Sequence, residues 1–262
     1  MDLDLTGKHA LVCGGSQGIG LATAKALASL GADVTLLARR AELLRTLADD
    51  LPRVHRAQAH GWIAADAADT DTLKAQVEAL AAGKPVHILV NNSGGPAPGP
   101  VHGTEIAAFE AAYRQHLVAN HVLAEAVIPG MQADGFGRIV NVISTSVKEP
   151  IKGLGVSNTT RWAVASWAKT LATELAQYGI TVNNVLPGST QTPRIEQIID
   201  TRSGKTGRSR EDIHADMVAE IPMGRFARPE ETAAAIAFLC SPAAGYITGI
   251  NLPVDGGRTR SL

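Results

Sequence analysis

The sequence lacks an excess of either charge, a set of cysteines and any long apolar run. Its 262 residues carry 24 Lys+Arg against 25 Asp+Glu, a formal net charge of -1, so nucleic-acid binding through a basic surface is not expected. No stretch approaches the ~18 unbroken apolar residues of a membrane span. Two cysteines, Cys13 and Cys240, cannot form a dense disulfide framework. Because Cys13 sits in an apolar run, we expect a buried free thiol and a reducing, cytoplasmic setting.

Neither end of the sequence resembles a targeting signal. The opening MDLDLTGK is too acidic and too poor in apolar residues for a secretory signal peptide. The closing RTRSL differs from the Ser-Lys-Leu peroxisomal address. The composition, 45% hydrophobic and 19% charged, is typical of a soluble globular core. We therefore expect a cytoplasmic protein without membrane or nucleic-acid partners.

Short apolar runs alternate with longer helical patterns along the chain. The runs predict strands at 9–13, 34–38, 61–65, 86–90, 138–143, 180–186 and 250–254. The patterns predict helices at about 21–28, 41–51, 70–80, 105–131, 157–178 and 230–239. This alternation predicts an α/β fold, a Rossmann-type doubly wound parallel sheet of about seven strands with helices on both faces. With no linker or repeat, residues 1–262 are expected to form a single domain, and 193–219 is its only sizeable excursion.

A glycine-rich segment lies between the first predicted strand and the first predicted helix. Glycines let the backbone turn sharply and approach a pyrophosphate closely, and the helix N-terminus behind them supplies free N–H donors. The segment therefore predicts a dinucleotide site. Its predicted contacts are Gly14, Ser16, Gln17, Gly18, Ile19 and Gly20.

The glycine spacing, Gly-x-x-x-Gly-x-Gly, resembles that of the short-chain dehydrogenase/reductase family. The resemblance continues in Asn-Asn-Ser-Gly at 91–94, Gly-Arg-Ile-Val-Asn-Val at 137–142 and Pro-Gly at 187–188 with Thr192. Segments 221–225, 246–249 and 255–257 resemble the family's C-terminal third. In order and spacing, the motifs are most similar to those of β-ketoacyl-acyl carrier protein reductases. The resemblance implies a small-molecule carbonyl or carrier-bound substrate, a lid at 193–219, and a homotetramer or homodimer.

The end of the second strand indicates the cofactor. An acidic residue there would favour NAD, but the position is Ala38, followed by Arg39 and Arg40. Guanidinium groups suit a 2′-phosphate, so NADP(H) is expected over NAD(H). Asp66 resembles the family's adenine-contacting aspartate, with a solvated carboxylate or helix cap as the alternative. The other cofactor contacts that the resemblance implies are Asn91, Ser93, Gly94, Arg161, Pro187, Gly188, Thr190 and Thr192.

The resemblance also implies four catalytic positions, and the chain differs from the family at three of them. Ser144 occupies the position of the serine that holds the substrate carbonyl. Counting 13 residues on from Ser144 leads to Ser157, so Ser157 and Arg161 stand where the family has its Tyr-x-x-x-Lys pair. His116 stands where the family has an asparagine. The chain is therefore expected to belong to a divergent branch.

The replacements suggest different chemistry. Arg161 stays protonated and can contact a ribose or stabilise an alkoxide, but it cannot cycle protons. Ser157 can relay a hydrogen bond, or serve only as a helix cap. His116 is expected to titrate near neutrality and to act as a general acid, unless it is a structural helix histidine. His102, in the loop after the fourth strand, is a second acid candidate.

Two functions remain open from the sequence. The first is an NADP(H)-dependent oxidoreductase acting on a carbonyl or alcohol with non-standard proton delivery. The second is a non-catalytic nucleotide-binding protein on the same fold. No metal site is predicted. Basic residues between 202 and 210 could meet an anionic substrate or carrier, or be a solvated, flexible surface.

Overall fold

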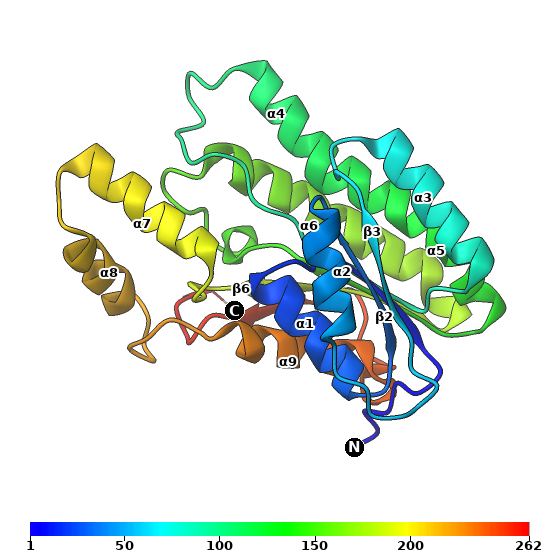
Figure 1. Cartoon of the computed structure of the whole chain (residues 1–262). Coiled ribbons are helices and arrows are strands. Elements are labelled where there is room, and N and C mark those ends of the chain that lie inside the picture. The colour runs from blue at the N-terminus through cyan, green and yellow to red at the C-terminus, as the bar shows by residue number, and fades with distance from the viewer. Residues whose placement is uncertain (262) are drawn as a thin grey trace.

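A computed structural model describes residues 1–261 of the chain, as Figure 1 shows. These residues form one parallel sheet of seven strands in the order β3-β2-β1-β4-β5-β6-β7. The strands are β1 His9–Cys13, β2 Asp33–Ala38, β3 His60–Ala64, β4 Ile88–Asn91, β5 Gly137–Val142, β6 Ile180–Pro187 and β7 Asn251–Val254. The strand order reverses between β1 and β4, which is where an open α/β sheet forms a ligand crevice.

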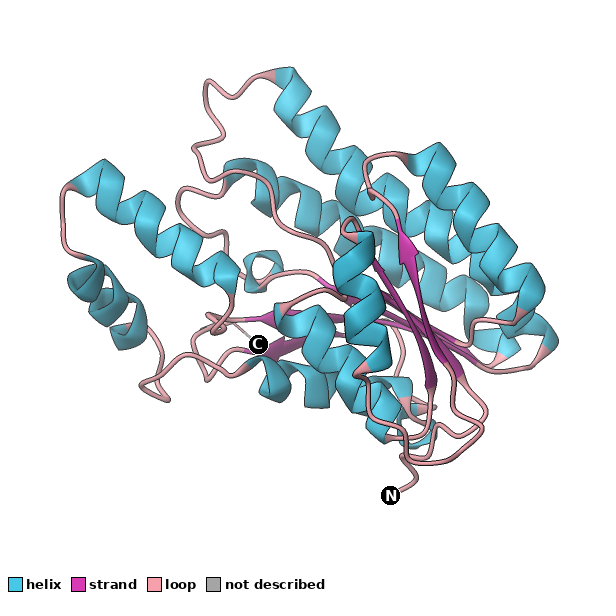
Figure 2. Cartoon of the chain, viewed as in Figure 1, coloured by secondary structure: helices cyan, strands magenta, loops and turns pink. Residues whose placement is uncertain are grey.

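Helices cover both faces of the sheet (Figure 2). One face carries α1 Gly18–Ser29, α2 Ala41–Asp49 and α9 Pro229–Cys240, and the other carries α3 Thr70–Gly83, α5 Ala119–Ala133 and α6 Gly155–Leu175. Leu27, Leu44 and Ile236 anchor the first core layer, and Leu73 and Leu123 anchor the second. The predicted single-domain, doubly wound sheet is thereby confirmed for 1–261, while residue 262 lies outside the described residues.

The strands are apolar because both of their faces are covered. All five residues of β1 are buried, whereas β3, at the edge of the sheet, is only half-buried. Cys13 and Cys240 are both buried free thiols, and burial raises the pKa of each to about 12. The expected free thiol at Cys13 is therefore confirmed.

Residues 193–219 form two helices, α7 Pro193–Thr206 and α8 Arg210–Ala219. In Figure 1 they project to one side of the sheet, in yellow and orange. Together with Ile221 and Phe226 of the following segment, they form a small apolar cluster that also contains Ile195, Ile199, Ile213 and Met217. Arg210 also joins the two helices by ion pairs with Glu196 and Asp200.

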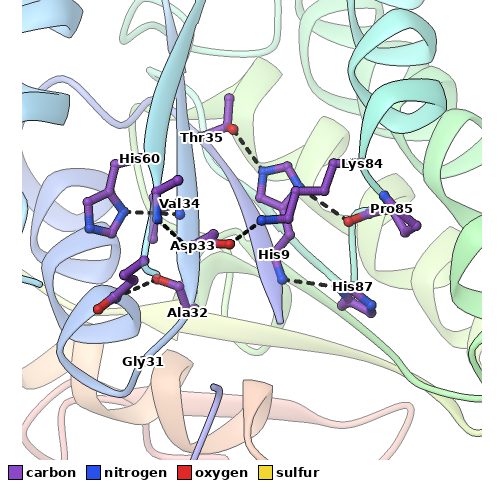
Figure 3. A network of polar contacts seen from close by, with 12 residues as sticks. His9, Gly31, Ala32, Asp33, Val34, Thr35, His60, Lys84, Pro85 and His87 are labelled. Atoms are coloured by element: carbon purple, nitrogen blue, oxygen red, sulfur yellow. Dashed lines mark hydrogen bonds and ion pairs between the residues drawn. The ribbon is translucent and has the colours of Figure 1, made fainter. Parts of the chain in front are cut away.

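A network of polar contacts joins residues near the amino ends of β1 and β2 to residues just before β4 (Figure 3). It lies at the opposite end of these strands from their carboxyl ends. His9 Nε2 lies 2.8 Å from Thr35 Oγ1 and its Nδ1 lies 3.2 Å from the Pro85 carbonyl oxygen. Since a carbonyl only accepts, Nδ1 carries the proton and the neutral ring is fully bonded. Asp33 forms an ion pair with Lys84 in the same network.

Within residues 1–261, no helix is long and apolar enough to cross a membrane.

Candidate active site

A cavity of about 1080 Å³ opens at the carboxyl ends of the strands, on both sides of the point where the strand order reverses. Gly14 follows β1, Arg39 follows β2, Ser93 follows β4, Ser144 follows β5 and Gly188 follows β6, and all five line it. Its volume exceeds that of a typical small-ligand pocket. A dinucleotide and a small substrate can therefore both fit.

The glycine loop is built for close approach. Gly14 has a φ of 60°, and a Cβ there would lie 2.6 Å from Nδ2 of Asn92. A Cβ on Gly20 would clash with the Gly14 carbonyl oxygen. Gln17, the N-cap of α1, makes no side-chain capping bond, so the first N–H groups of that helix are open to an anion. The loop therefore fits a pyrophosphate.

Three charged side chains line the other end of the cavity. Arg39 and Arg40 follow β2, are exposed and make no ion pair within the described part of the chain. Asp66 follows β3, and its Oδ1 accepts a hydrogen bond from the Ala68 N–H at 3.0 Å. The two guanidinium groups have the charge to hold a 2′-phosphate, while Asp66 keeps one carboxylate oxygen available.

Most of the predicted site residues lie in the cavity wall. Those that line it are Gly14, Ser16, Gln17, Gly18, Ile19, Arg39, Arg40, Asp66, Ser93, Gly94, Ser144, Ser157, Arg161, Pro187, Gly188, Thr190 and Thr192. Gly20, Asn91 and His116 do not line it, and neither does His102, which is exposed elsewhere.

Asn91 belongs to a row of side-chain amides that crosses four strands. Nδ2 of Asn91 donates to Oδ1 of Asn141 at 2.9 Å, Nδ2 of Asn141 to Oδ1 of Asn184 at 2.9 Å, and Nδ2 of Asn184 to Oδ1 of Asn251 at 2.8 Å. Each residue is paired directly with the next in the sheet register. The Asn91 side chain, a predicted cofactor contact, is therefore buried in this row and does not line the cavity, whereas Asn92 does.

His116 is buried beneath the cavity, with a relative exposure of 1%. Its Nδ1 lies 2.7 Å from the Ser93 hydroxyl, and its Nε2 has no partner among the described residues. Burial, together with the nearby charge of Arg161, lowers the pKa of His116 to about 2. The expectation that this ring titrates near neutrality is therefore wrong, because the interior disfavours its charged form.

The helix expected over 105–131 is interrupted by a wider turn. α4 Ile106–Tyr113 continues into a π-helical segment, Arg114–Val118, before α5 begins. Gln115, within this segment, lines the cavity and donates to the Gly94 carbonyl oxygen at 3.1 Å. Such segments occur frequently at functional sites, and this one carries both Gln115 and His116 against the loop after β4.

Ser144 has a hydroxyl hydrogen available for a ligand. Its Oγ accepts from the Ser146 N–H at 3.0 Å, which leaves its own O–H to donate into the cavity. Ser157 lines the same cavity from the first turn of α6. Its neighbour Asn158 is instead tied to the backbone of Ile151. Within residues 157–161, Ser157 and Arg161 thus line the cavity, whereas Asn158 is held by the Ile151 backbone.

Arg161 and Arg194 reach the cavity from different elements. Arg161, on α6, is 7% exposed and donates to the Val142 carbonyl oxygen at 3.2 Å. Burial and then the charge of Arg194 lower the pKa of Arg161 to about 10. Arg194, in the first turn of α7, donates to the Pro96 carbonyl oxygen at 2.8 Å.

Sequence reasoning missed several residues of the cavity wall. They are Asn92, Gly95, Gln115, Asn120, Leu154 and Arg194. The position of Asn92 beside the glycine loop was signalled by the same Asn-Asn-Ser-Gly motif from which Asn91 was chosen. No comparable signal exists for Arg194, which the sequence presents only as one of several charges in the excursion.

Comparisons with known proteins place this architecture in a family. The family profile described as "Enoyl-(Acyl carrier protein) reductase" matches residues 14–259. The cis-4-hydroxycyclohexanecarboxylate dehydrogenase of Sinomonas cyclohexanicum is 35% identical over 95% of this chain and 96% of its own. The structure of L-sorbose reductase from Gluconobacter frateurii with NADPH and L-sorbose has a TM-score of 0.91 at 31% identity, covering all of both chains. Another, named short chain dehydrogenase/reductase family protein, has a TM-score of 0.80 at 35% identity, covering 98% of this chain and 99% of its own.

The glycine loop, the seven-stranded parallel sheet and the matches over nearly the whole chain lead to the same conclusion. The protein belongs to the short-chain dehydrogenase/reductase family.

Proposed function

We propose that the protein is an NADP(H)-dependent oxidoreductase that interconverts a carbonyl compound and its alcohol. The observation that carries the proposal is one cavity with the glycine loop and the uncapped start of α1 on one side and Ser144 and Arg161 on the other. The names of two relatives support it, since one is a dehydrogenase of a hydroxycyclohexanecarboxylate and the other a reductase of L-sorbose.

NADP(H) is the preferred cofactor in this proposal. The Gly14–Gly20 loop and the start of α1 would hold the pyrophosphate, and Arg39 and Arg40 the 2′-phosphate. The NADPH in the L-sorbose reductase structure is consistent with this choice. When bound, the cofactor supplies or accepts the hydride.

Ser144 and Arg161 act on the substrate oxygen. The free O–H of Ser144 donates to the carbonyl and orients it. The buried cation of Arg161 favours the negative charge that develops on that oxygen during reduction. In the reduction, the carbonyl carbon gains a hydride and the oxygen gains a proton.

Proton delivery is non-standard in this proposal. Among the described residues, no tyrosine, histidine or lysine lines the cavity. The proton therefore comes from solvent by way of the Ser144 or Ser157 hydroxyl. Because a positioned acid or base contributes ~10²–10⁴-fold to rate, we expect slow turnover of simple ketones. The chain would then represent a branch of the family without the Tyr-Lys pair.

Residues 193–219 act as a lid over a small-molecule carbonyl or carrier-bound substrate. The working protein is a homotetramer or homodimer. We place it in the cytoplasm, because its two buried free thiols suit a reducing compartment.

A second candidate is a nucleotide-binding protein without catalysis, favoured by the same lack of a titrating donor in the cavity. NADPH binding and NADPH oxidation, measured in parallel against aldehydes, ketones and oxo acids, separate the two. Binding without oxidation throughout would support the second candidate. Arg39→Ala should weaken NADPH binding about tenfold or more and leave NADH unchanged. Arg45→Ala, an exposed arginine of α2 outside the cavity, is the control.

A further inference from the structure

Two arginines from distant parts of the chain meet beside the loop that follows β4. Nη2 of Arg194 and Nη2 of Arg161 lie 3.5 Å and 3.9 Å from the point that a Cβ on Gly95 would occupy. Both side chains line the cavity. One small ligand at this wall can therefore reach both guanidinium groups.

Neither guanidinium has a carboxylate partner within residues 1–261. Each donates one hydrogen bond to a backbone carbonyl, of Val142 and of Pro96 respectively. Since a guanidinium has five N–H donors, most of them remain for a ligand. The acidic residues of α7 do not neutralise the pair, because Glu196 and Asp200 are bound to Arg210.

An unpaired cation in this position is costly. Arg161 is almost fully buried, and a buried charge without a counter-ion is strongly unfavourable. Arg194 adds a like charge beside it, and both effects lower the pKa of Arg161. The pKa of about 10 still leaves it protonated near neutral pH. A bound anion would offset both costs.

The cofactor's own charges have other partners. NADP(H) is anionic at its pyrophosphate and its 2′-phosphate, which the proposed function assigns to the Gly14–Gly20 loop and to Arg39 and Arg40. The arginine pair lies instead beside Gly95, in the cavity that Ser144 also lines. It is therefore a third anion site, on the substrate's side.

We propose that Arg161 and Arg194 form a carboxylate-binding site. The substrate is then an oxo acid or hydroxy acid whose carboxylate lies close enough to the reacting oxygen for Arg161 to donate different N–H groups to both. A carboxylate presents two oxygens that planar guanidinium groups bind in pairs of hydrogen bonds. The choice of substrate rests on the proposed function, whereas anion binding by the pair does not.

Calorimetric titration of the NADPH-saturated protein with malonate, and with neutral malonamide, tests the site. Malonate should bind and malonamide should not. Arg161→Gln and Arg194→Gln should each weaken malonate binding by about tenfold or more. Arg45→Gln, which removes an exposed charge outside the cavity, should not change it. If Arg161→Gln fails to fold, Arg194→Gln at the cavity wall keeps the test complete.

Three results would overturn the site. They are no malonate binding, binding unchanged in both variants, or binding to the cofactor-free protein that saturating NADPH abolishes, which would assign the pair to a cofactor phosphate. NADPH oxidation with 3-oxo acids and with their methyl esters then separates the two proposals. Reduction of the esters but not the acids would reject the oxo-acid substrate and leave the proposed function standing. If malonate binds through the two arginines but no carbonyl compound oxidises NADPH, the proposed function is rejected and the site stands.

Discussion

The hydroxyl of Ser93 lies 2.7 Å from Nδ1 of His116, and this contact joins the loop after β4 to the π-helical segment below it. The ring stays neutral because burial lowers its pKa to about 2. Its function is therefore that of a neutral hydrogen-bonding group that holds Ser93 at the cavity wall. It is not a proton source that charges and discharges near pH 7.

The first prediction concerns the pH dependence of turnover. For any carbonyl compound that the protein reduces, kcat between pH 5.5 and 8.5 should show no limb from His116, because a group with a pKa of about 2 does not titrate there. His116→Asn should leave the shape of the profile unchanged. A limb near pH 6.5 that disappears in His116→Asn, but not in the exposed His102→Asn control, would contradict this assignment.

The second prediction concerns acid stability. Burial lowers the pKa of His9 to about 4, from 6.5 in the unfolded chain. Between these values the unfolded state binds more protons, so the stabilisation is complete above pH 6.5 and is lost as pH falls toward 4. The contribution of His9 to the free energy of unfolding that is lost in this way is on the order of 3 kcal/mol. The buried His116 makes the dependence of stability on pH steeper.

Urea unfolding of the ligand-free protein at several pH values measures this slope. His9→Gln keeps a polar group near Thr35 and Pro85 but cannot titrate, so its stability should fall less steeply between pH 6.5 and 4.5. His60, which is less buried than His9 and whose pKa burial also lowers, provides the comparison through His60→Gln. A wild-type midpoint that stays constant over this range would show that His9 is not buried as a neutral ring.

The third prediction concerns the amide row. Asn141 is 0% exposed and bonds to Asn91 and Asn184 at once. Asn141→Ala leaves polar atoms of both neighbours buried without partners, at a cost of about 2–4 kcal/mol of unfolding free energy. Asn251→Ala, at the exposed end of the row, should cost about 1 kcal/mol or less, because water can replace the lost partner. Equal losses in the two variants would count against a buried row.

The strands could be read from the sequence because of their environment. Strands covered on both faces are mostly apolar, so β1 and β2 were predicted within a residue of their observed bounds. The π-helical turn at Arg114–Val118 could not be read, because its residues continue the helical pattern of α4 and α5.

The sequence could predict those parts of the site that depend only on the local conformation of the chain. The glycine loop needs small residues at Gly14 and Gly20 whatever surrounds it. The sequence could not show that the Asn91 and His116 side chains are buried away from the cavity, because neighbouring strands and helices supply that burial. Arg194 was missed because its meeting with Arg161 depends on how α7 packs against the loop at Gly95.

The fourth prediction concerns Ser144. Ser144→Ala removes the hydroxyl that donates into the cavity, so kcat should fall by about 10²-fold, as for one lost donor to a developing oxyanion. NADPH affinity should stay within a factor of about three, because this group is assigned to the substrate oxygen. Ser166→Ala, an exposed serine of α6, is the control. Unchanged kcat in Ser144→Ala would remove this residue from the mechanism.

The last prediction concerns assembly, which we expect to be tetrameric rather than dimeric. α4 lies against α6, and their outer surface exposes Tyr113 at 49% and Trp162 at 51%. Tyr246 is fully exposed on a separate element near the C-terminus. In the expected tetramer, Tyr113 and Trp162 would lie in one kind of subunit contact and Tyr246 in the other, because a closed tetramer needs two kinds.

Light scattering at micromolar concentration measures the mass directly. The wild type should give about four times the 27.3 kDa of one chain. Tyr246→Glu should give a dimer held by the α4 and α6 surface, because a buried unpaired carboxylate opposes association at one interface only. Tyr113→Glu should instead disrupt the subunit contact formed by the α4 and α6 surface. Val54→Glu, at an exposed valine between α2 and β3, should leave the mass unchanged. A wild-type mass near 27.3 kDa would contradict assembly altogether.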